Sequence, residues 1–243
     1  MAEFKMNIAG HTALVHSLFD STRDYCKNYL TEDEPEFTIT VTKEDLAFEQ
    51  AELLAEAKAE GMKPRKFTDP FLDRAAIQRA FADWLFDRDI LLCHGSTVAV
   101  DGRAYLFTAK CGTGKSTHTR FWREVFGDRA VMVNDDKPFL RITENGVLAC
   151  GSPWNGKHGL GSNITVPLKA ICILERGEEN KIQPLSPKEA LFMLLQQSNR
   201  PRNPQHMIPY MDLLDKLSNG VSFYRLACNM TPQAAVVAYE AMK

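Results

Sequence analysis

The sequence contains no long apolar run and no excess of charge of either sign. No apolar stretch approaches the ~20 residues that cross a bilayer as a helix, and the first residues lack a secretory apolar segment. The formal net charge is −2, which gives no electrostatic basis for binding nucleic acid or an anionic membrane. We therefore expect a cytoplasmic protein with neither a membrane nor a nucleic acid as its partner.

Cysteine is sparse and irregularly placed. The six cysteines stand at positions 26, 93, 111, 150, 172 and 228, without paired spacing. This pattern argues against both a zinc site and a disulfide framework, and it suits a reducing compartment. Internal repeats and low-complexity segments are also lacking, so the chain is expected to form one large domain or two small ones.

One motif stands out. Residues 109–117 are Ala-Lys-Cys-Gly-Thr-Gly-Lys-Ser-Thr, which match the phosphate-binding pattern G-x-x-x-x-G-K-[ST] except that Ala109 replaces the leading glycine. In this pattern the glycines let backbone N–H groups curl around phosphate oxygens, Lys115 brings a charge to the outer phosphates, and Ser116 offers a hydroxyl to Mg²⁺. The residues expected to bind a nucleotide are Cys111, Gly112, Thr113, Gly114, Lys115, Ser116 and Thr117.

The flanking sequence suits this function. Residues 97–108 alternate apolar side chains around Asp101-Gly102, which predicts a β-hairpin. Residues 117–126 have helical spacing and end at Gly127, a residue typical of helix C-termini. The order strand, loop, helix places a helix N-terminus at the anion. The strand before the loop is expected to pair with its antiparallel predecessor, unlike that of ordinary phosphate-loop nucleotidases.

Two carboxylates follow the next apolar segment. Residues 129–134 form a short predicted strand that leads into Asp135 and Asp136. Successive side chains of a strand point to opposite sides, so we assign different roles to them. Asp135 is predicted to hold Mg²⁺, and Asp136 to act as general base on an acceptor hydroxyl. The alternative is an ordinary turn before Lys137-Pro138.

Residues 151–163 follow a second predicted hairpin at Asn145-Gly146 and gather four glycines, Trp154 and several polar side chains without periodicity. Lys157 is predicted to neutralise charge on a transferred phosphoryl group. His158 and Asn163 are candidate substrate contacts, as are Arg200 and Arg202 in a later loop. A surface loop with one buried Trp remains the alternative for residues 151–163, and exposed loop arginines are common.

Together, His94-Gly95, the hairpin, the glycine-rich motif and Asp135-Asp136 resemble the catalytic domain of bacterial HPr kinase/phosphorylase over roughly residues 93–175. The motif also resembles that of phosphoenolpyruvate carboxykinase. The resemblance implies an α/β fold with a mixed, largely antiparallel sheet, a P-loop and flanking helices. It also implies ATP and Mg²⁺ as cofactors, and it makes His94 a site residue that assists Asp136. Because relatives assemble into rings, a homo-oligomer is a partner that the resemblance suggests.

The sequence departs from that family at one place. HPr kinases carry a Glu-Arg-Gly-Leu-Gly-type segment whose glutamate binds metal, whereas residues 151–154 are Gly-Ser-Pro-Trp. The sequence is more similar to stand-alone serine-kinase-type relatives. We expect a kinase that phosphorylates a hydroxyl of a small molecule or of a protein serine. The alternatives are a non-catalytic nucleotide-binding or regulatory module and, less favoured, a carboxykinase-like lyase.

The remaining patterns predict a supporting α+β region at residues 1–90 and the kinase domain at residues 91–243. The first region is expected to contain strands within residues 4–15 and 36–41, a helix that starts at a Thr42–Asp45 capping box and ends near Gly61, and a helix that starts at Asp69-Pro70. The second is expected to add a strand at 168–174, a helix from Ser186 to about Ser198, a break at 199–204, a strand at 221–227 and a helix capped at Thr231-Pro232.

Overall fold

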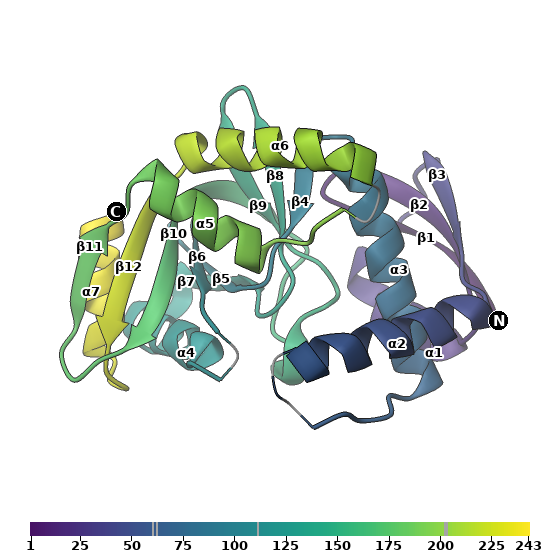
Figure 1. Cartoon of the computed structure of the whole chain (residues 1–243), viewed down its shortest axis with the longest axis horizontal. Coiled ribbons are helices and arrows are strands. Elements are labelled where there is room, and N and C mark those ends of the chain that lie inside the picture. The colour runs from purple at the N-terminus through teal and green to yellow at the C-terminus, as the bar shows by residue number, and fades with distance from the viewer. Residues whose placement is uncertain (60, 62, 111, 202–203) are drawn as a thin grey trace. The chain divides into compact units, whose positions relative to one another are not determined.

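The computed structural model describes residues 1–59, 61, 63–110, 112–201 and 204–243 (Figure 1). Its contacts divide the chain into two compact units, Met1–Trp84 and Leu85–Lys243. Among the residues that the structure describes, none of the helices combines the length and the apolar character needed to cross a membrane.

The first unit has a three-stranded sheet and three helices. Its strands and helices are β1 (Ala2–Ile8), β2 (His11–Ser17), α1 (Asp20–Tyr25), β3 (Phe37–Thr40), α2 (Lys43–Ala59) and α3 (Asp69–Phe86), which continues into the second unit. β1 and β2 form an antiparallel hairpin, and β3 pairs parallel to β2. Residues 4–15, where strand structure was expected, therefore contain most of two strands that turn at Ala9 and Gly10, both with positive φ.

Predicted capping and packing signals account for these helices. The backbone N–H of Thr42 donates to Asp45 Oδ2 at 3.0 Å, and that of Asp45 donates to Thr42 Oγ1 at 3.3 Å, so the predicted capping box is confirmed. On α3, Trp84 stacks on Phe37 of β3 with ring centroids 3.9 Å apart. The aromatic residues of this helix thus serve packing between helix and sheet.

The second unit is built on one nine-stranded mixed sheet. Its path is β4-β8-β9-β10-β6-β5-β7, and β12 and then β11 branch from β10. The pairs β10–β6 and β10–β12 are parallel, and the others are antiparallel. The strands are β4 (Ile90–Leu92), β5 (Ser96–Val100), β6 (Arg103–Thr108), β7 (Ala130–Asn134), β8 (Phe139–Thr143), β9 (Gly146–Cys150), β10 (Thr165–Arg176), β11 (Lys181–Pro184) and β12 (Ser222–Cys228).

Helices cover both faces of this sheet (Figure 1). Leu106 of β6 belongs to a core cluster with Leu194 and Leu214, from helices α5 (Pro187–Gln197) and α6 (Met207–Gly220). Phe107, the next residue of β6, belongs to a second cluster with helices α4 (Lys115–Phe126) and α7 (Gln233–Met242). Because successive side chains alternate between faces, β6 is buried on both sides and is a rigid support for the loop that follows it.

Both predicted hairpins are confirmed. β5 and β6 pair antiparallel across Asp101-Gly102, and β8 and β9 pair across Asn145. Asp101 and Gly102 both have positive φ, as a tight hairpin turn requires. The expected strand at 168–174 extends over Thr165–Arg176, and α5 begins with the expected capping box at Ser186 and Glu189.

One expectation needs correction, and one helix was not expected. α7 begins after Pro232 without a side-chain cap, because the Thr231 hydroxyl donates instead to Asn229 Oδ1 at 2.7 Å. The sequence also gave no indication of α6, whose apolar stripe follows closely after the Asn199–Pro204 break. α6 is held by packing: Tyr210, Leu214 and their neighbours belong to the cluster that covers the sheet.

We expect the protein to lose stability in acid because of a buried histidine. His118 of α4 is 3% exposed, and its Nε2 accepts a hydrogen bond from Trp122 Nε1 at 3.0 Å. Burial lowers the pKa of His118 from 6.5 to about 3. Between these values the unfolded chain binds a proton that the folded protein excludes, so the free energy of unfolding should fall as pH decreases through this range.

Urea unfolding from pH 7 to pH 4 measures this dependence. The matched variant is His118→Asn, which keeps an acceptor near the indole but has no titrating ring. Its unfolding free energy should change less steeply with pH than that of the wild type. Equal slopes in the two proteins would contradict a role for His118 in the acid sensitivity.

Candidate functional site

The glycine-rich loop, residues 109–117, connects β6 to α4. Gly112 has φ of +75° and Gly114 has φ of +120°, values that residues with a Cβ rarely adopt. Gly114 is the N-cap residue of α4, so the helix begins with Lys115 and Ser116. The loop therefore lies at a helix N-terminus, where the partial positive charge favours anions. Cys111 lies outside the described residues.

Polar groups of this loop bond to one another. Lys115 Nζ donates to the carbonyl oxygen of Ala109 at 3.1 Å, and the N–H of Thr113 donates to the carbonyl of Lys110 at 3.2 Å. The lysine thus folds back over the start of the loop. A phosphate that takes the Lys115 ammonium group would replace a neutral carbonyl by a charged acceptor, which forms a stronger hydrogen bond.

Asp135 is connected to the first turn of α4. It is 6% exposed, and its Oδ1 accepts a hydrogen bond from Ser96 Oγ at 2.6 Å. Ser96 Oγ in turn lies 2.8 Å from Thr119 Oγ1, and Thr119 Oγ1 lies 3.3 Å from the carbonyl oxygen of Ser116. This chain of hydroxyls holds the carboxylate toward the helix that begins at the glycine-rich loop.

Asp136, the next residue, lies beside His94. His94 Nε2 is 3.4 Å from Asp136 Oδ1, and the N–H of Gly95 donates to the carbonyl of Asp136 at 3.0 Å. Burial, and then the charges of Lys137 and Lys115, lower the pKa of His94 to about 3. His94 is therefore neutral at pH 7, and its contact with Asp136 is not a salt bridge.

The pKa of Asp136 itself is raised above its ordinary value. Burial is the largest cause and the charge of Asp135 adds to it, while Lys137 and Lys115 act in the opposite direction. The side chain is nevertheless 35% exposed, so a substrate can reach it. A carboxylate with a raised pKa in an accessible position is suited to accept a proton.

Asn134, the last residue of β7, organises the segment that carries both acids. Its side chain is completely buried. Its Oδ1 accepts from the backbone N–H of Asp136 at 2.8 Å and of Lys137 at 2.6 Å. Its Nδ2 lies 2.9 Å from Ser152 Oγ and 2.8 Å from Asn155 Oδ1. One amide thus joins the acidic segment to residues 151–163.

Residues 151–163 are divided between a buried and an exposed part. Trp154 is 7% exposed, whereas Lys157 and His158 are exposed on a short 3₁₀ turn and Asn163 is exposed beyond it. Gly156 sits against the acid: a Cβ there would lie 3.2 Å from Asp136 Cβ. The structure therefore brings the backbone next to Lys157 up to Asp136, and places His158 and Asn163 in the exposed part of this segment.

Gln197, rather than an arginine, connects the end of α5 to the site. Its carbonyl accepts from the His94 N–H at 2.8 Å, and its side-chain oxygen accepts from Thr108 Oγ1 at 2.8 Å. Arg200 instead donates to the carbonyl of Leu195, at 3.2 and 3.1 Å, which holds it at the end of α5. Arg202 lies outside the described residues.

Asn134, Ser96, Thr119 and Gln197 are not among the site residues that the sequence predicted. A signal existed for Asn134, because an Asn before a turn commonly bonds the backbone N–H two residues later. For Ser96 and Gln197 no local signal existed, since their partners are distant in sequence, and the same holds for the contact between Thr119 and Ser96.

The oxygen donors near the loop are of the kind that Mg²⁺ prefers over a softer metal's sulfur and nitrogen ligands. Within the described part of the chain there is no group of three or more His, Cys, Asp or Glu side chains that could hold a metal ion. The Ser116 hydroxyl and the Asp135 carboxylate provide oxygen donors only. Such a partial set fits Mg²⁺, which keeps several waters and takes its remaining ligands from phosphates.

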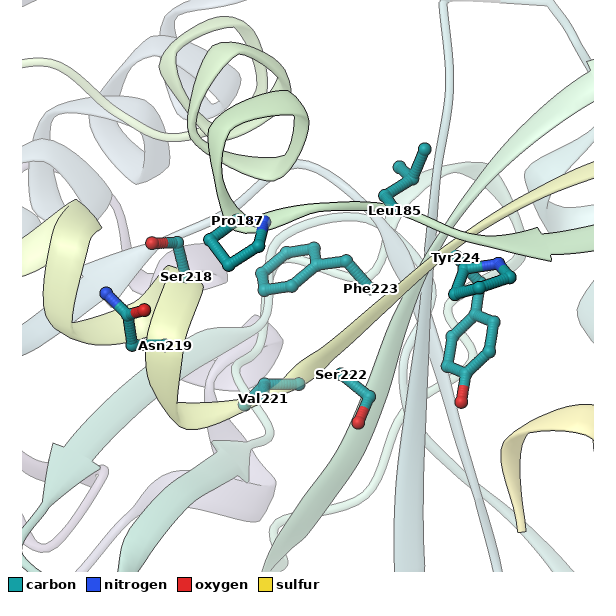
Figure 2. Close-up of a pocket in the computed structure, with 9 residues that line it drawn as sticks. Leu185, Pro187, Ser218, Asn219, Val221, Ser222, Phe223 and Tyr224 are labelled. Carbon is teal, nitrogen blue, oxygen red and sulfur yellow. The ribbon is translucent and has the colours of Figure 1, made fainter.

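A cavity of about 270 Å³ lies elsewhere in the same unit. Figure 2 shows it between the start of α5, the end of α6 and β12, with Pro187, Ser218 and Phe223 among its lining residues. The residues that line it include none of the predicted site residues. The cavity is therefore not assigned to the candidate site.

We expect Asn134→Ala to disturb both stability and the acidic segment. The substitution removes a buried amide and leaves the N–H groups of Asp136 and Lys137 without their acceptor, which should cost about 1–3 kcal/mol of unfolding free energy. Urea unfolding measures this loss, with Asn219→Ala on the surface of α6 as the control. A loss no larger than that of the control would contradict the central position of Asn134.

A family model described as "SynChlorMet cassette protein ScmC" matches residues 85–237. Among solved structures, the Hpr(Ser) kinase/phosphatase from Coxiella burnetii is similar over 62% of this chain and 93% of its own, with 13% sequence identity and a TM-score of 0.35, a distant relationship. No curated protein matches the sequence. Because the family model covers more than half of the chain, including both acids and the glycine-rich loop, the chain belongs to the SynChlorMet cassette protein ScmC family.

Proposed function

We propose that the unit Leu85–Lys243 is an ATP- and Mg²⁺-dependent phosphotransferase that transfers the γ-phosphoryl group of ATP to a hydroxyl. The position of Asp136 is the observation that carries this proposal. This acid is accessible, has a raised pKa, adjoins a neutral histidine and lies within the electrostatic influence of Lys115. A hydroxyl acceptor needs such a base near the phosphates of the donor.

Each part of the site takes one role in the proposed reaction. Described residues of the glycine-rich loop, namely Gly112, Thr113, Gly114, Lys115, Ser116 and Thr117, bind the phosphates of ATP. Ser116 and Asp135 hold Mg²⁺, which supplies positive charge to the outer phosphate oxygens. Asp136 takes the proton of the acceptor hydroxyl, and His94 orients that carboxylate. Lys157, next to the close approach of Gly156 to Asp136, neutralises charge on the moving phosphoryl group.

The acceptor is a hydroxyl of a small molecule or of a protein serine, and the site does not distinguish the two. A second candidate is a nucleotide-binding module without catalysis. One observation favours it: the buried segment 151–154 is Gly-Ser-Pro-Trp and brings no carboxylate to the acids. Protein that binds ATP but never consumes it, with any hydroxyl compound of a metabolite and peptide panel, would favour this second candidate.

Replacement of the proposed base gives the first test. Asp136→Asn should leave the Kd for ATP within about twofold of the wild type, because the phosphates bind elsewhere, and should lower kcat by roughly 10²–10⁴. Binding is measured by calorimetry and turnover by release or transfer of labelled γ-phosphate. Asp128→Asn, at an exposed position, is the control. Turnover of Asp136→Asn equal to that of the control would exclude Asp136 as the base.

The pH dependence of turnover gives a second test. The base must be unprotonated, so kcat/KM should fall as pH decreases through the raised pKa of Asp136. Lys137 lowers this pKa, and removal of its charge should raise the pKa further. Lys137→Gln should therefore shift the acidic limb of the pH–rate profile to higher pH. A limb that stays in place or moves to lower pH would show that another group titrates there.

A further inference from the structure

Two strand ends lie beside the glycine-rich loop. β10 and β12 pair in parallel, and their last residues, Arg176 and Cys228, are opposite each other. The segments that follow are bonded together: the Gly177 N–H donates to the Cys228 carbonyl at 3.0 Å, and the Asn229 N–H donates to Asn180 Oδ1 at 3.0 Å. These hydrogen bonds hold residues 176–180 and 228–230 together, and we call the two segments the edge next to the loop.

This edge bonds the loop at Gly112 and approaches it at Gly114, the two glycines with positive φ. Arg176 Nη2 donates to the carbonyl oxygen of Gly112 at 2.8 Å. Met230 Sδ lies 3.8 Å from the position that a Cβ of Gly114 would occupy. Arg176 is 64 positions from Gly112 in sequence, so only the fold places this second cation at the motif.

Arg176 carries a charged hydrogen-bond donor group, whereas Met230 carries an apolar thioether. A guanidinium carries several N–H donors in a fork, and the Gly112 carbonyl takes one of them, so the others remain for a phosphate oxygen. Met230 is 65% exposed. An exposed, flexible thioether beside a phosphate loop provides an adaptable apolar surface for an aromatic ring.

We propose that Arg176 and Met230 form a second wall of the nucleotide site: Arg176 binds the phosphate tail and holds the Gly112 peptide, and Met230 packs on the nucleobase. This inference rests on the proposed nucleotide binding. It adds a phosphate-binding residue and a base contact that lie outside the glycine-rich motif.

Two ligands separate the two roles. ATP and inorganic tripolyphosphate share the phosphate chain, but tripolyphosphate has no base. Calorimetric titration with each ligand in the presence of Mg²⁺ is made on wild type, Arg176→Gln and Met230→Ala. The controls are Arg103→Gln, at the end of β6 away from the loop, and Met211→Ala, a partly exposed methionine of α6. Thermal unfolding checks that each variant is folded.

Arg176→Gln should weaken binding of both ligands about tenfold or more, since it removes a charge-assisted hydrogen bond. Met230→Ala should weaken ATP about threefold to tenfold and leave tripolyphosphate unchanged. The controls should match the wild type. Wild-type affinity of Arg176→Gln for both ligands, or an equal effect of Met230→Ala on both ligands, would overturn the proposal.

The results distinguish a failure of the second wall from a failure of the proposed nucleotide binding. If wild type binds ATP and Lys115→Ala abolishes binding while both edge variants bind normally, the nucleotide site stands and the second wall is wrong. If wild type binds neither ligand, the proposed function fails and the second wall with it. If Arg176→Gln does not fold, Arg176→Lys replaces it, and its weaker geometry should still lower the affinity for both ligands.

Discussion

The buried side chain of Asn134 is the interaction on which the candidate site depends. Its oxygen receives the N–H groups of Asp136 and Lys137, and its nitrogen contacts Ser152 and Asn155. Because the amide is fully buried, water cannot replace any of these partners, and the loss of one leaves another unsatisfied. The acidic segment, which follows β7, and residues 151–163, which follow β9, are therefore held as a unit.

The sheet fixes the position of the glycine-rich loop relative to the acidic segment. β6 is buried on both faces, so the start of the glycine-rich loop cannot shift without disturbing two cores. β5 pairs with β6 on one side and with β7 on the other. Strand β5 thus sets the spacing between the loop and the acids, and its own Ser96 bonds Asp135. The antiparallel neighbour of β6 is part of the site as well as part of the fold.

The features that sequence predicted are those encoded over a few residues. The turns at Asp101-Gly102 and Asn145-Gly146 depend on local conformational preference, and so do the capping boxes at Thr42 and Ser186. The sequence showed no comparable signal for the branching of β10, which pairs with three strands, or for Gln197 at His94, because such contacts depend on residues far apart in the chain. The roles of the site residues remain predictions, whereas their placement is now described for all but Cys111 and Arg202.

The proposed division of labour between the two adjacent acids agrees with their exposure and not with the expected strand alternation, because β7 ends at Asn134 and both acids lie in the bend that follows it. Asp135 points inward, where it is 6% exposed and already accepts a hydrogen bond from Ser96. Asp136 lies beside His94 and stays accessible. A group that takes a proton from a substrate has to touch it, whereas a metal contact made through water does not require this access. The neutral state of His94 supports the same division, since a charged imidazolium would lower the basicity of Asp136. Gly156 lies so close to Asp136 that a side chain at this position would crowd the acid, and the absence of a Cβ there keeps Asp136 open to the acceptor hydroxyl of the proposed reaction.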